Sequence, residues 1–354
     1  MKTNHLKTIY VLHKKGEKNH HNGLVALARS EGAAVKFREF SIITGIFKAL
    51  FKVDINLLQK QVINSFFMVS LLFTRNRRIV LGIAPYDYKL PMVLFFLRHH
   101  KVFYHTSWTC WDGSYYPKKK WVTEKLKKAW AVFLEQKCKH IFAVSTKTRE
   151  ELLAHYNIAA SKINVVYHTV DEAFFKDYEL ERKPDGFIYT GRLLPEKGLM
   201  PLLDFFSKNR ELHFTVAGSG PLEEEVRRYA DQHKNIRFKG FIRDKKTLAA
   251  LLQRHTYLLL NARKTGTWEE LFGLVIAEAM AGKTIPIATL HPGPREIITH
   301  GKDGFLVTEE EMLPFIKDRL AAEIPAEMQK AAFNTALTYS EEEIAKRWRP
   351  VFTS

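Results

Sequence analysis

The sequence contains only two cysteines, Cys110 and Cys138, among its 354 residues. They have no paired spacing and no histidine cluster at ligand distance, which argues against a disulfide framework or a structural zinc site. Long apolar runs are also missing. The longest, residues 62–73, is interrupted by polar residues and falls short of the roughly 18 needed to span a bilayer, so we expect it to form buried core. Residues 1–21 lack the pattern of a secretion signal, and we expect a cytoplasmic protein.

Acidic residues are scarce in the first half of the chain. Residues 1–170 carry 28 Lys and Arg against 10 Asp and Glu, whereas residues 171–354 carry 27 against 28. The whole positive excess of the protein therefore lies in the first half. Such asymmetry indicates an anionic partner for that half, such as nucleic acid, a phospholipid surface or a phosphorylated acceptor.

Strand-like and helix-like segments alternate through most of the second half, with short turns between them. This alternation predicts a parallel β-sheet covered by helices on both faces. The expected strands are residues 187–191, 212–218, 236–242, 257–262, 284–288 and 304–307.

The first half shows the same alternation with less regularity, so the sequence predicts an α/β protein with two doubly wound domains. Its expected strands are residues 8–13, 34–40, 77–83, 101–107, 140–145 and 163–170. The pattern breaks between residues 171 and 184, and we place the domains at 1–172 and 173–337. A final helix at about 338–354, with Ser340 as its cap and Glu343 three positions on, is expected to pack back on the first domain.

Ligands of open parallel sheets bind beyond the carboxyl ends of the strands, and unusual residues gather in those loops. Arg192 and Lys197 follow the first strand of the second half, after Gly191 and just before a helix. Two cations beside a helix N-terminus suit a diphosphate. A second glycine turn, Gly218 and Gly220, follows the next strand, although any strand-to-helix turn can use glycine for its backbone freedom.

Two carboxylates, Glu270 and Glu278, flank the expected start of a helix near Phe272 or Gly273. Eight residues at the helical rise would separate them by roughly 12 Å, about the length of a ribose-diphosphate-sugar unit. Glu278 would then accept hydrogen bonds from ribose hydroxyls and Glu270 from a sugar. The phosphates would meet the backbone amides of Leu271, Phe272, Gly273 and Leu274.

A plainer reading of these acids remains open. Glu270 would only favour the helix dipole and Glu278 would be an exposed helical residue. That reading does not explain why Glu278 interrupts the apolar segment 274–281, where a charge without a partner is costly.

These motifs, in this order, resemble a retaining glycosyltransferase of the GT-B fold, glycosyltransferase family 4. The resemblance covers about residues 187–307, and its most specific element is the pair of glutamates around Phe272 and Gly273. It implies that Arg192 and Lys197 bind the donor diphosphate. Glu270 would contact the donor sugar and Glu278 the ribose. Phe241 and Ile242 are candidates for the base by position only.

The first half resembles the family less closely. His168 replaces the usual Asn, and the glycine-rich acceptor loop is reduced to Gly16 and Gly23. His105 matches a position where these enzymes often place a histidine near the donor sugar. A core histidine with a hydrogen-bond partner is an equally open reading of His105.

The resemblance implies a metal-independent transfer of a hexose from a UDP or GDP type of sugar, with no cofactor. Cationic side chains and helix amides stabilise the departing diphosphate. Catalytic roles are therefore expected for Arg192, Lys197, Glu270 and His105, and acceptor-side roles for Gly16 and His105. The acceptor would be a saccharide or glycolipid in bacterial lipopolysaccharide or surface-polysaccharide synthesis.

A segment rich in lysine and tryptophan, residues 115–140, is a candidate for peripheral contact with an anionic membrane. Alternatively, its apolar side packs on the sheet and its lysines are only solvated. The residues concerned are Lys118, Lys119, Lys120, Trp121, Lys125, Lys127, Lys128 and Trp130.

Two other classes of function remain open. A nucleic-acid-binding protein fits the pI of about 9.6, but it leaves the donor-site pattern unexplained, and no nucleic-acid partner is expected. An inactive scaffold on a transferase fold fits the reduced N-terminal loop, although the second-half motifs are intact.

Overall fold

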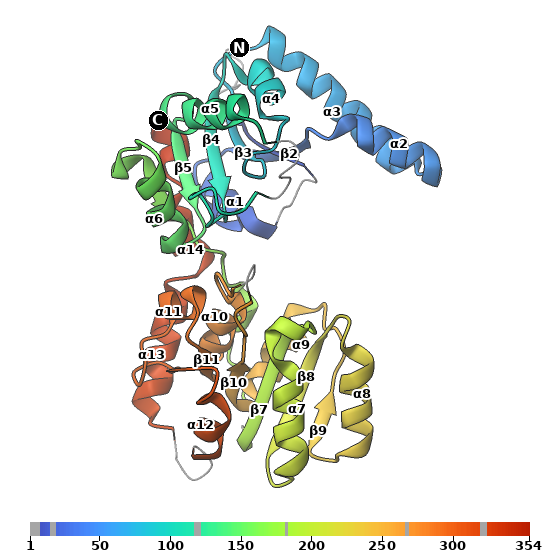
Figure 1. Ribbon diagram of the computed structural model, residues 1–354, viewed down its shortest axis with the longest axis vertical. Coiled ribbons are helices and arrows are strands. Elements are labelled where there is room, and N and C mark those ends of the chain that lie inside the picture. Colours follow the sequence, from blue (N-terminus) through green and yellow to red (C-terminus); the bar gives the residue numbers. More distant parts are fainter. Residues whose placement is uncertain (1–7, 15–18, 117–121, 181–182, 266–268, 319–323) are drawn as a thin grey trace. The chain divides into compact units, whose positions relative to one another are not determined.

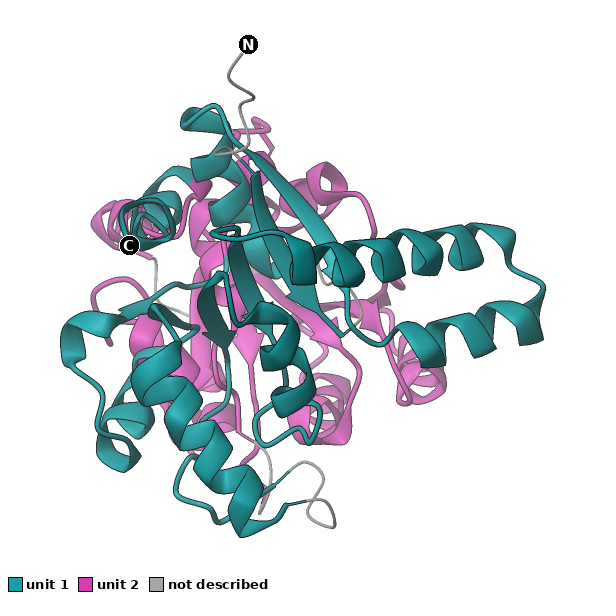
Figure 2. Cartoon of the chain, turned by 90° about the horizontal axis from the view of Figure 1, so that it is seen from above, with its two compact units in different colours: residues 1–168, 342–354 teal, residues 169–341 magenta. Residues whose placement is uncertain are grey.

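The computed structural model describes residues 8–14, 19–116, 122–180, 183–265, 269–318 and 324–354. The chain divides into two compact units (Figure 2). Unit 1 comprises residues 1–168 and 342–354, and unit 2 comprises residues 169–341. The sequence analysis drew the corresponding limits at 172 and at about 338.

Unit 1 is built on a parallel six-stranded sheet with the strand order β2-β1-β3-β4-β5-β6 (Figure 1). These strands are mostly apolar because helices cover both of their faces. They are β1 (Thr8–His13), β2 (Ala34–Glu39), β3 (Arg78–Gly82), β4 (Lys101–Thr106), β5 (His140–Ala143) and β6 (Ile163–Val165).

Helices pack on both faces of this sheet. One core joins the sheet to α1 (Asn22–Ser30), α14 (Glu341–Arg347) and α15 (Pro350–Thr353). In it the ring of Trp348 lies 4.3 Å from the ring of Phe142, so the C-terminal segment is part of the core of unit 1. The other core joins the sheet to α3 (Ile55–Phe73), α4 (Leu90–Leu97) and α5 (Glu124–Val132).

The remaining helical segments of unit 1 are peripheral or short. They are η2 (Asn19–His21), α2 (Ile42–Lys52), the π-helical turn η4 (Phe133–Lys137), α6 (Thr146–His155) and η5 (Ala160–Lys162).

Unit 2 repeats the architecture with the strand order β12-β11-β10-β7-β8-β9, all parallel. Stacked aromatic rings fill its centre, as Phe206 and Phe214 show with centroids 4.3 Å apart. The strands are β7 (Lys183–Arg192), β8 (His213–Ser219), β9 (Ile236–Phe238), β10 (His255–Leu260), β11 (Ile285–Thr289) and β12 (Phe305–Val307).

Each crossover between parallel strands of unit 2 carries a helix, which is the usual connection between such strands. Together with unit 1, this arrangement confirms the doubly wound α/β architecture. The helical segments are η6 (Glu172–Phe175), η7 (Pro195–Lys197), α7 (Leu199–Lys208), α8 (Glu223–Gln232), α9 (Lys245–Gln253), α10 (Leu274–Ala281), α11 (Pro292–Ile297), α12 (Met312–Asp318) and α13 (Ala326–Leu337).

The expectation of buried core for residues 62–73 is wrong for much of that run. The run forms the second part of α3, where the side chains of one face enter the core and those of the opposite face are exposed. Among the described residues, none of the helices is long and apolar enough to cross a membrane. The buried side chains are Phe67, Met68 and Leu71, and the exposed ones are Val62, Ile63, Phe66, Val69 and Phe73.

Candidate functional site

The candidate site of unit 2 lies at the point where the order in which strands are added to its sheet reverses. The chain proceeds from β7 through β8 to β9 and then continues at β10 on the other side of β7. The loops that leave β7 and β10 at their carboxyl ends therefore run to opposite sides and open a crevice, which is where doubly wound sheets bind ligands.

A cavity of about 240 Å³ occupies this edge of the sheet. It brings together Gly191, Arg192, Gly218, Phe241 and Ile242, which the sequence analysis selected as donor-binding residues from three separate loops. The other lining residues are Thr190, Ala217, Ser219, Leu248 and Val275.

Glycine at position 218 is required by the backbone of this cavity. Gly218 has a φ of 153°, and a Cβ placed there would lie 1.8 Å from the carbonyl oxygen of Gly191. The β7 and β8 strand ends therefore approach each other more closely than any residue with a side chain permits.

Arg192 and Phe241 present exposed side chains at the cavity. The guanidinium belongs to the last residue of β7, whose carbonyl oxygen accepts a hydrogen bond of 2.6 Å from the Tyr189 hydroxyl. This bond fixes the end of the strand. A cation and an aromatic ring at one small cavity suit a ligand with an anionic part and a planar part.

Lys197 and Glu270 form an ion pair between their side chains. Only 11% of the Lys197 side chain and 12% of the Glu270 side chain are exposed. Lys197 ends the turn η7, which is tied to the end of β10 by a 2.8 Å bond from the Asn261 amide to the Gly198 carbonyl. Both residues were expected from the sequence to bind the donor, and the structure places them in direct contact beside the loop of Arg192.

The segment that contains Glu270 is held against the start of α11. The Gly293 amide donates to the Glu270 carbonyl oxygen at 2.9 Å. A Cβ at Gly293 would lie 2.4 Å from the Phe272 nitrogen, so the two segments touch through their backbones. Leu271 is half-buried and Phe272 is buried in this contact.

Helix α10 starts close to the predicted position. Gly273 caps it in the left-handed conformation, with a φ of 73°, and the helix begins at Leu274. Glu270 precedes the helix and Glu278 lies within it. The separation of roughly 12 Å assumed helical rise over the whole stretch, and that assumption is wrong for residues 270–273.

Glu278 is half-buried on α10, and its pKa is raised to about 7. Burial is the main cause; Lys245 opposes the shift and Asp171 adds to it. Lys245 and Asp171 form an ion pair of 3.0 Å. Because Val275 lies one turn before Glu278 on the same helix, Glu278 lies on the side of α10 that borders the 240 Å³ cavity.

A second cavity, of about 250 Å³, lies at the corresponding edge of the sheet of unit 1. His105 lines it from the end of β4, and His13, His20 and His21 line it from β1 and the turn before α1. His21 and His105 have ring centroids 4.7 Å apart. Burial, with the neighbouring histidines, lowers the pKa of His105 well below its usual value.

His168 joins the same cluster, 4.6 Å from His20 between ring centroids. Burial lowers its pKa to about 4. His105 and His168 were noted from the sequence, but His13 at the end of β1 and His20 and His21 in the turn before α1 were missed; the histidines in residues 13–21 were the available signal. Gly16 lies outside the described residues. Within the described part of the chain, no group of three or more His, Cys, Asp or Glu side chains is placed to hold a metal ion.

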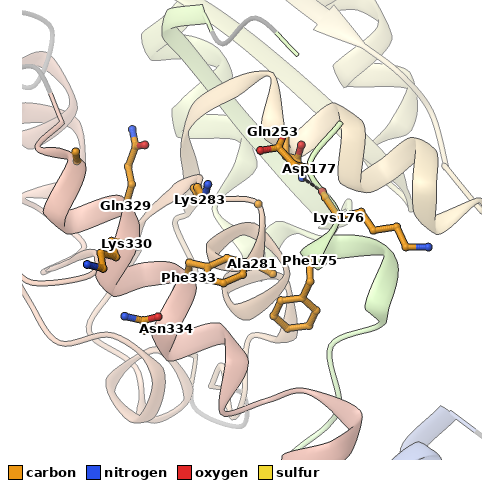
Figure 3. A pocket seen from close by; sticks show the side chains of 12 residues that line it. Phe175, Lys176, Asp177, Gln253, Ala281, Lys283, Gln329, Lys330, Phe333 and Asn334 are labelled. Carbon is orange, nitrogen blue, oxygen red and sulfur yellow. Dashed lines mark hydrogen bonds between the residues drawn. The ribbon is translucent and has the colours of Figure 1, made fainter. Parts of the chain in front are cut away.

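A larger cavity of unit 2 lies elsewhere and is lined by none of the predicted site residues. It has about 700 Å³ and is lined by residues of η6, α10 and α13, including Phe175, Lys283 and Phe333 (Figure 3). The side chains labelled in Figure 3 are of mixed chemistry, with three lysines, one aspartate, three side-chain amides, two phenylalanines and one alanine.

Comparisons with known proteins extend the sequence resemblance. Residues 170–321 match the family model described as Glycosyl transferases group 1, and residues 72–174 match that of Glycosyltransferase Family 4. These matches confirm the resemblance to glycosyltransferase family 4, and between them they contain every predicted site residue except Gly16.

Curated relatives are similar over part of their length. The chain is 32% identical over 152 residues to 2-deoxystreptamine N-acetyl-D-glucosaminyltransferase of Niallia circulans, covering 40% of this chain and 37% of that protein. It is 24% identical over 174 residues to the O-antigen chain mannosyltransferase RfbU of Salmonella typhimurium, covering 47% and 46%. The matches thus span less than half the length of these relatives.

A solved structure shares its fold with nearly the whole length of this chain. The crystal structure of Alr3699/HepE of Anabaena in complex with UDP superposes with a TM-score of 0.67 at 17% identity, covering 96% of this chain and 97% of that one. The protein therefore has the GT-B fold.

Proposed function

Given a GT-B chain whose second unit matches the glycosyl transferases of group 1, we propose that the protein is a retaining glycosyltransferase. It moves a hexose from a UDP or GDP sugar to a saccharide acceptor. The observation that carries this proposal is the 240 Å³ cavity at the point where the strand order of unit 2 reverses, which gathers five of the predicted donor-binding residues within the region that matches the group 1 model.

The proposed transfer breaks the bond between the sugar C1 and the diphosphate oxygen. The acceptor hydroxyl forms a new bond to C1 on the same face, and its proton passes to the departing diphosphate. Positive charge beside that diphosphate stabilises the transition state, because negative charge grows on the leaving oxygen.

The residues of unit 2 have distinct proposed roles. Arg192 binds the diphosphate with the amides at the start of α10, and Phe241 covers the base. Glu278 accepts hydrogen bonds from the ribose hydroxyls. Lys197 has three N–H donors, so it can keep its bond to Glu270 and also donate to a phosphate oxygen. Glu270 then orients the sugar.

Unit 1 is proposed to bind the acceptor, with His105 in the 250 Å³ cavity as its main contact. RfbU is named for the O-antigen chain, which supports a lipid-linked saccharide in lipopolysaccharide or surface-polysaccharide synthesis as the acceptor class. The location proposed is the cytoplasm, at the inner face of the membrane.

The test is release of nucleoside diphosphate from UDP-glucose, UDP-galactose, UDP-N-acetylglucosamine and GDP-mannose. With a saccharide acceptor, nuclear magnetic resonance of the product gives the anomeric configuration. We expect one donor to be consumed with retention, at a rate that EDTA leaves unchanged. Inversion would contradict the mechanism, and loss of rate with EDTA would contradict metal independence.

A further inference from the structure

Helices α2 and α3 form an antiparallel hairpin that projects from the sheet of unit 1 (Figures 1 and 2). The turn between them is Val53 and Asp54, and the Asp54 carboxylate accepts a hydrogen bond of 2.9 Å from the Leu57 amide to cap α3. The hairpin therefore has a regular structure, and the exposure of its outer side chains follows from that structure.

The outward side of α2 is a stripe of large apolar residues. Ile43, Phe47, Leu50 and Phe51 recur at helical spacing, and all are exposed. The side that faces α3 carries small residues instead. A Cβ at Gly45 would lie 2.6 Å from the Gln61 side chain. The helix thus puts its small residues on its partner and its large apolar ones in solvent.

Part of α3 likewise has polar residues on its buried side and apolar residues on its exposed side. Gln61 and Asn64 are buried polar residues, and the Gln61 amide donates to the Glu39 carboxylate at 2.8 Å. The exposed side carries Val62, Phe66, Val69 and Phe73 at intervals of four, three and four residues. A helix that is apolar on its outer side requires cover by another apolar phase.

The most exposed apolar side chains lie at the tip of the hairpin. Phe51 is 91% exposed, Val53 is 83% exposed and Ile55 is 68% exposed. Val53 also adopts a φ of 51°, a left-handed conformation that a β-branched residue rarely takes. Three bulky apolar side chains are thus presented outward within five residues.

Positive charge surrounds this apolar surface. Residues 41–75, which contain the hairpin, carry four Lys and Arg but only one acidic residue, Asp54. Lys48 and Lys52 lie among the apolar residues of α2, and Arg75 follows the end of α3; all three are exposed. Lysines beside large apolar residues on a helix are typical of a surface that enters the interface of an anionic bilayer.

We propose that the α2–α3 hairpin docks the protein on an anionic lipid bilayer, with Phe51, Val53 and Ile55 inserted between the headgroups. A second copy of the chain would bring its own lysines against these lysines, whereas anionic lipid complements them. This surface differs from the lysine-rich segment of the sequence analysis, in which Trp130 of α5 is buried, Lys125 and Lys128 are exposed, and residues 117–121 lie outside the described part of the chain.

The test is co-sedimentation of the full chain with vesicles of phosphatidylcholine containing about 30% phosphatidylglycerol. The test variant is Phe51→Ser with Phe66→Ser. The control is Val132→Ser with Leu337→Ser, which removes exposed apolar side chains outside the hairpin. A third variant, Lys125→Ala with Lys128→Ala, examines the exposed lysines of α5.

We expect the wild type, the control and the α5 variant to sediment equally. The bound fraction of the hairpin variant should fall by about tenfold, because binding scales with buried apolar area. Thermal unfolding of that variant should be unchanged, since both side chains are exposed. Equal sedimentation of the hairpin variant, or none by the wild type, would overturn the proposal. So would a wild-type dimer by light scattering that the hairpin variant loses. None of these outcomes depends on nucleotide binding.

Discussion

Lys197 and Glu270, 73 positions apart in the sequence, form a largely buried ion pair beside the candidate donor site. It joins the turn after β7 to the segment before α10. A few positions away, Lys264 and Glu269 form a second ion pair, but 68% of that lysine side chain is exposed. The two pairs differ mainly in burial, so they make a matched comparison.

Glu270→Gln should lower the free energy of unfolding by about 3 kcal/mol, because it leaves the Lys197 ammonium buried without its counter-charge. Glu269→Gln should change it by at most about 0.5 kcal/mol, as is usual for an exposed pair. Urea unfolding of the two variants checks both values. Equal effects would show that the contact between Lys197 and Glu270 does not stabilise unit 2.

Glu278 should make the stability of unit 2 depend on pH. Its pKa is raised from 4.5 to about 7 in the folded protein, so the folded state keeps a proton that the unfolded chain loses. The stability of unit 2 should therefore decrease as pH rises from 4.5 to 7, by about 3 kcal/mol from this group. Glu278→Gln should abolish that decrease. Parallel stability curves for wild type and variant over this range would contradict the assignment.

His168 should make the stability of unit 1 depend on pH in the opposite direction. Its pKa is lowered from 6.5 to about 4, so on acidification the unfolded chain binds a proton before the folded protein does. Stability from this group is present above pH 6.5 and is lost as pH falls toward 4. His168→Asn should reduce that loss by about 3 kcal/mol.

Tryptophan fluorescence is the measurement for unit 1, since Trp108, Trp111, Trp121, Trp130 and Trp348 belong to unit 1 and only Trp268 belongs to unit 2. An unchanged acid transition in His168→Asn would mean that another group of the histidine cluster controls it.

Gly218→Ala should damage the cavity, because its Cβ would lie 1.8 Å from the Gly191 oxygen. We expect a loss of more than about 2 kcal/mol in stability and loss of nucleotide binding. Gly240→Ala is the control: Gly240 has a φ of 63° but no atom within 4 Å of its would-be Cβ, so only the strain of about 1 kcal/mol remains. Thermal shift of both variants compares the two, and similar losses would contradict the close approach of β7 and β8.

The strands and the start of α10 could be predicted because their signals are local. Apolar runs punctuated by glycine located β7 and β8, and Gly273 located the helix start within one residue. The pairing of Lys197 with Glu270 was not predictable, because it depends on the β7 and β10 ends becoming neighbours in the sheet. The clustering of His13, His20 and His21 with His105 was missed because His105 comes from β4, a distant part of the sequence.

The exposed side of α3 shows another limit of sequence reasoning. An apolar run indicates that its side chains avoid water, but it does not indicate whether protein or lipid covers them. On the opposite side, the Gln61 amide donates to the Glu39 carboxylate and the Asn64 Oδ1 accepts from the Glu39 backbone amide, so the burial of both residues depends on Glu39 of β2. The apolar character and the length of the run therefore predicted core where the structure has a surface.

The most direct test of the central claim is isothermal titration of the protein with UDP, GDP and ADP, together with Arg192→Ala and Arg210→Ala. Arg192 is exposed at the cavity of unit 2, and Arg210 is another exposed arginine, outside its lining. We predict that one nucleotide binds the wild type and Arg210→Ala alike and binds Arg192→Ala about tenfold more weakly, as expected for a lost charge-assisted hydrogen bond. Absence of binding by all three nucleotides, or equal binding by Arg192→Ala, would contradict a donor site in this cavity.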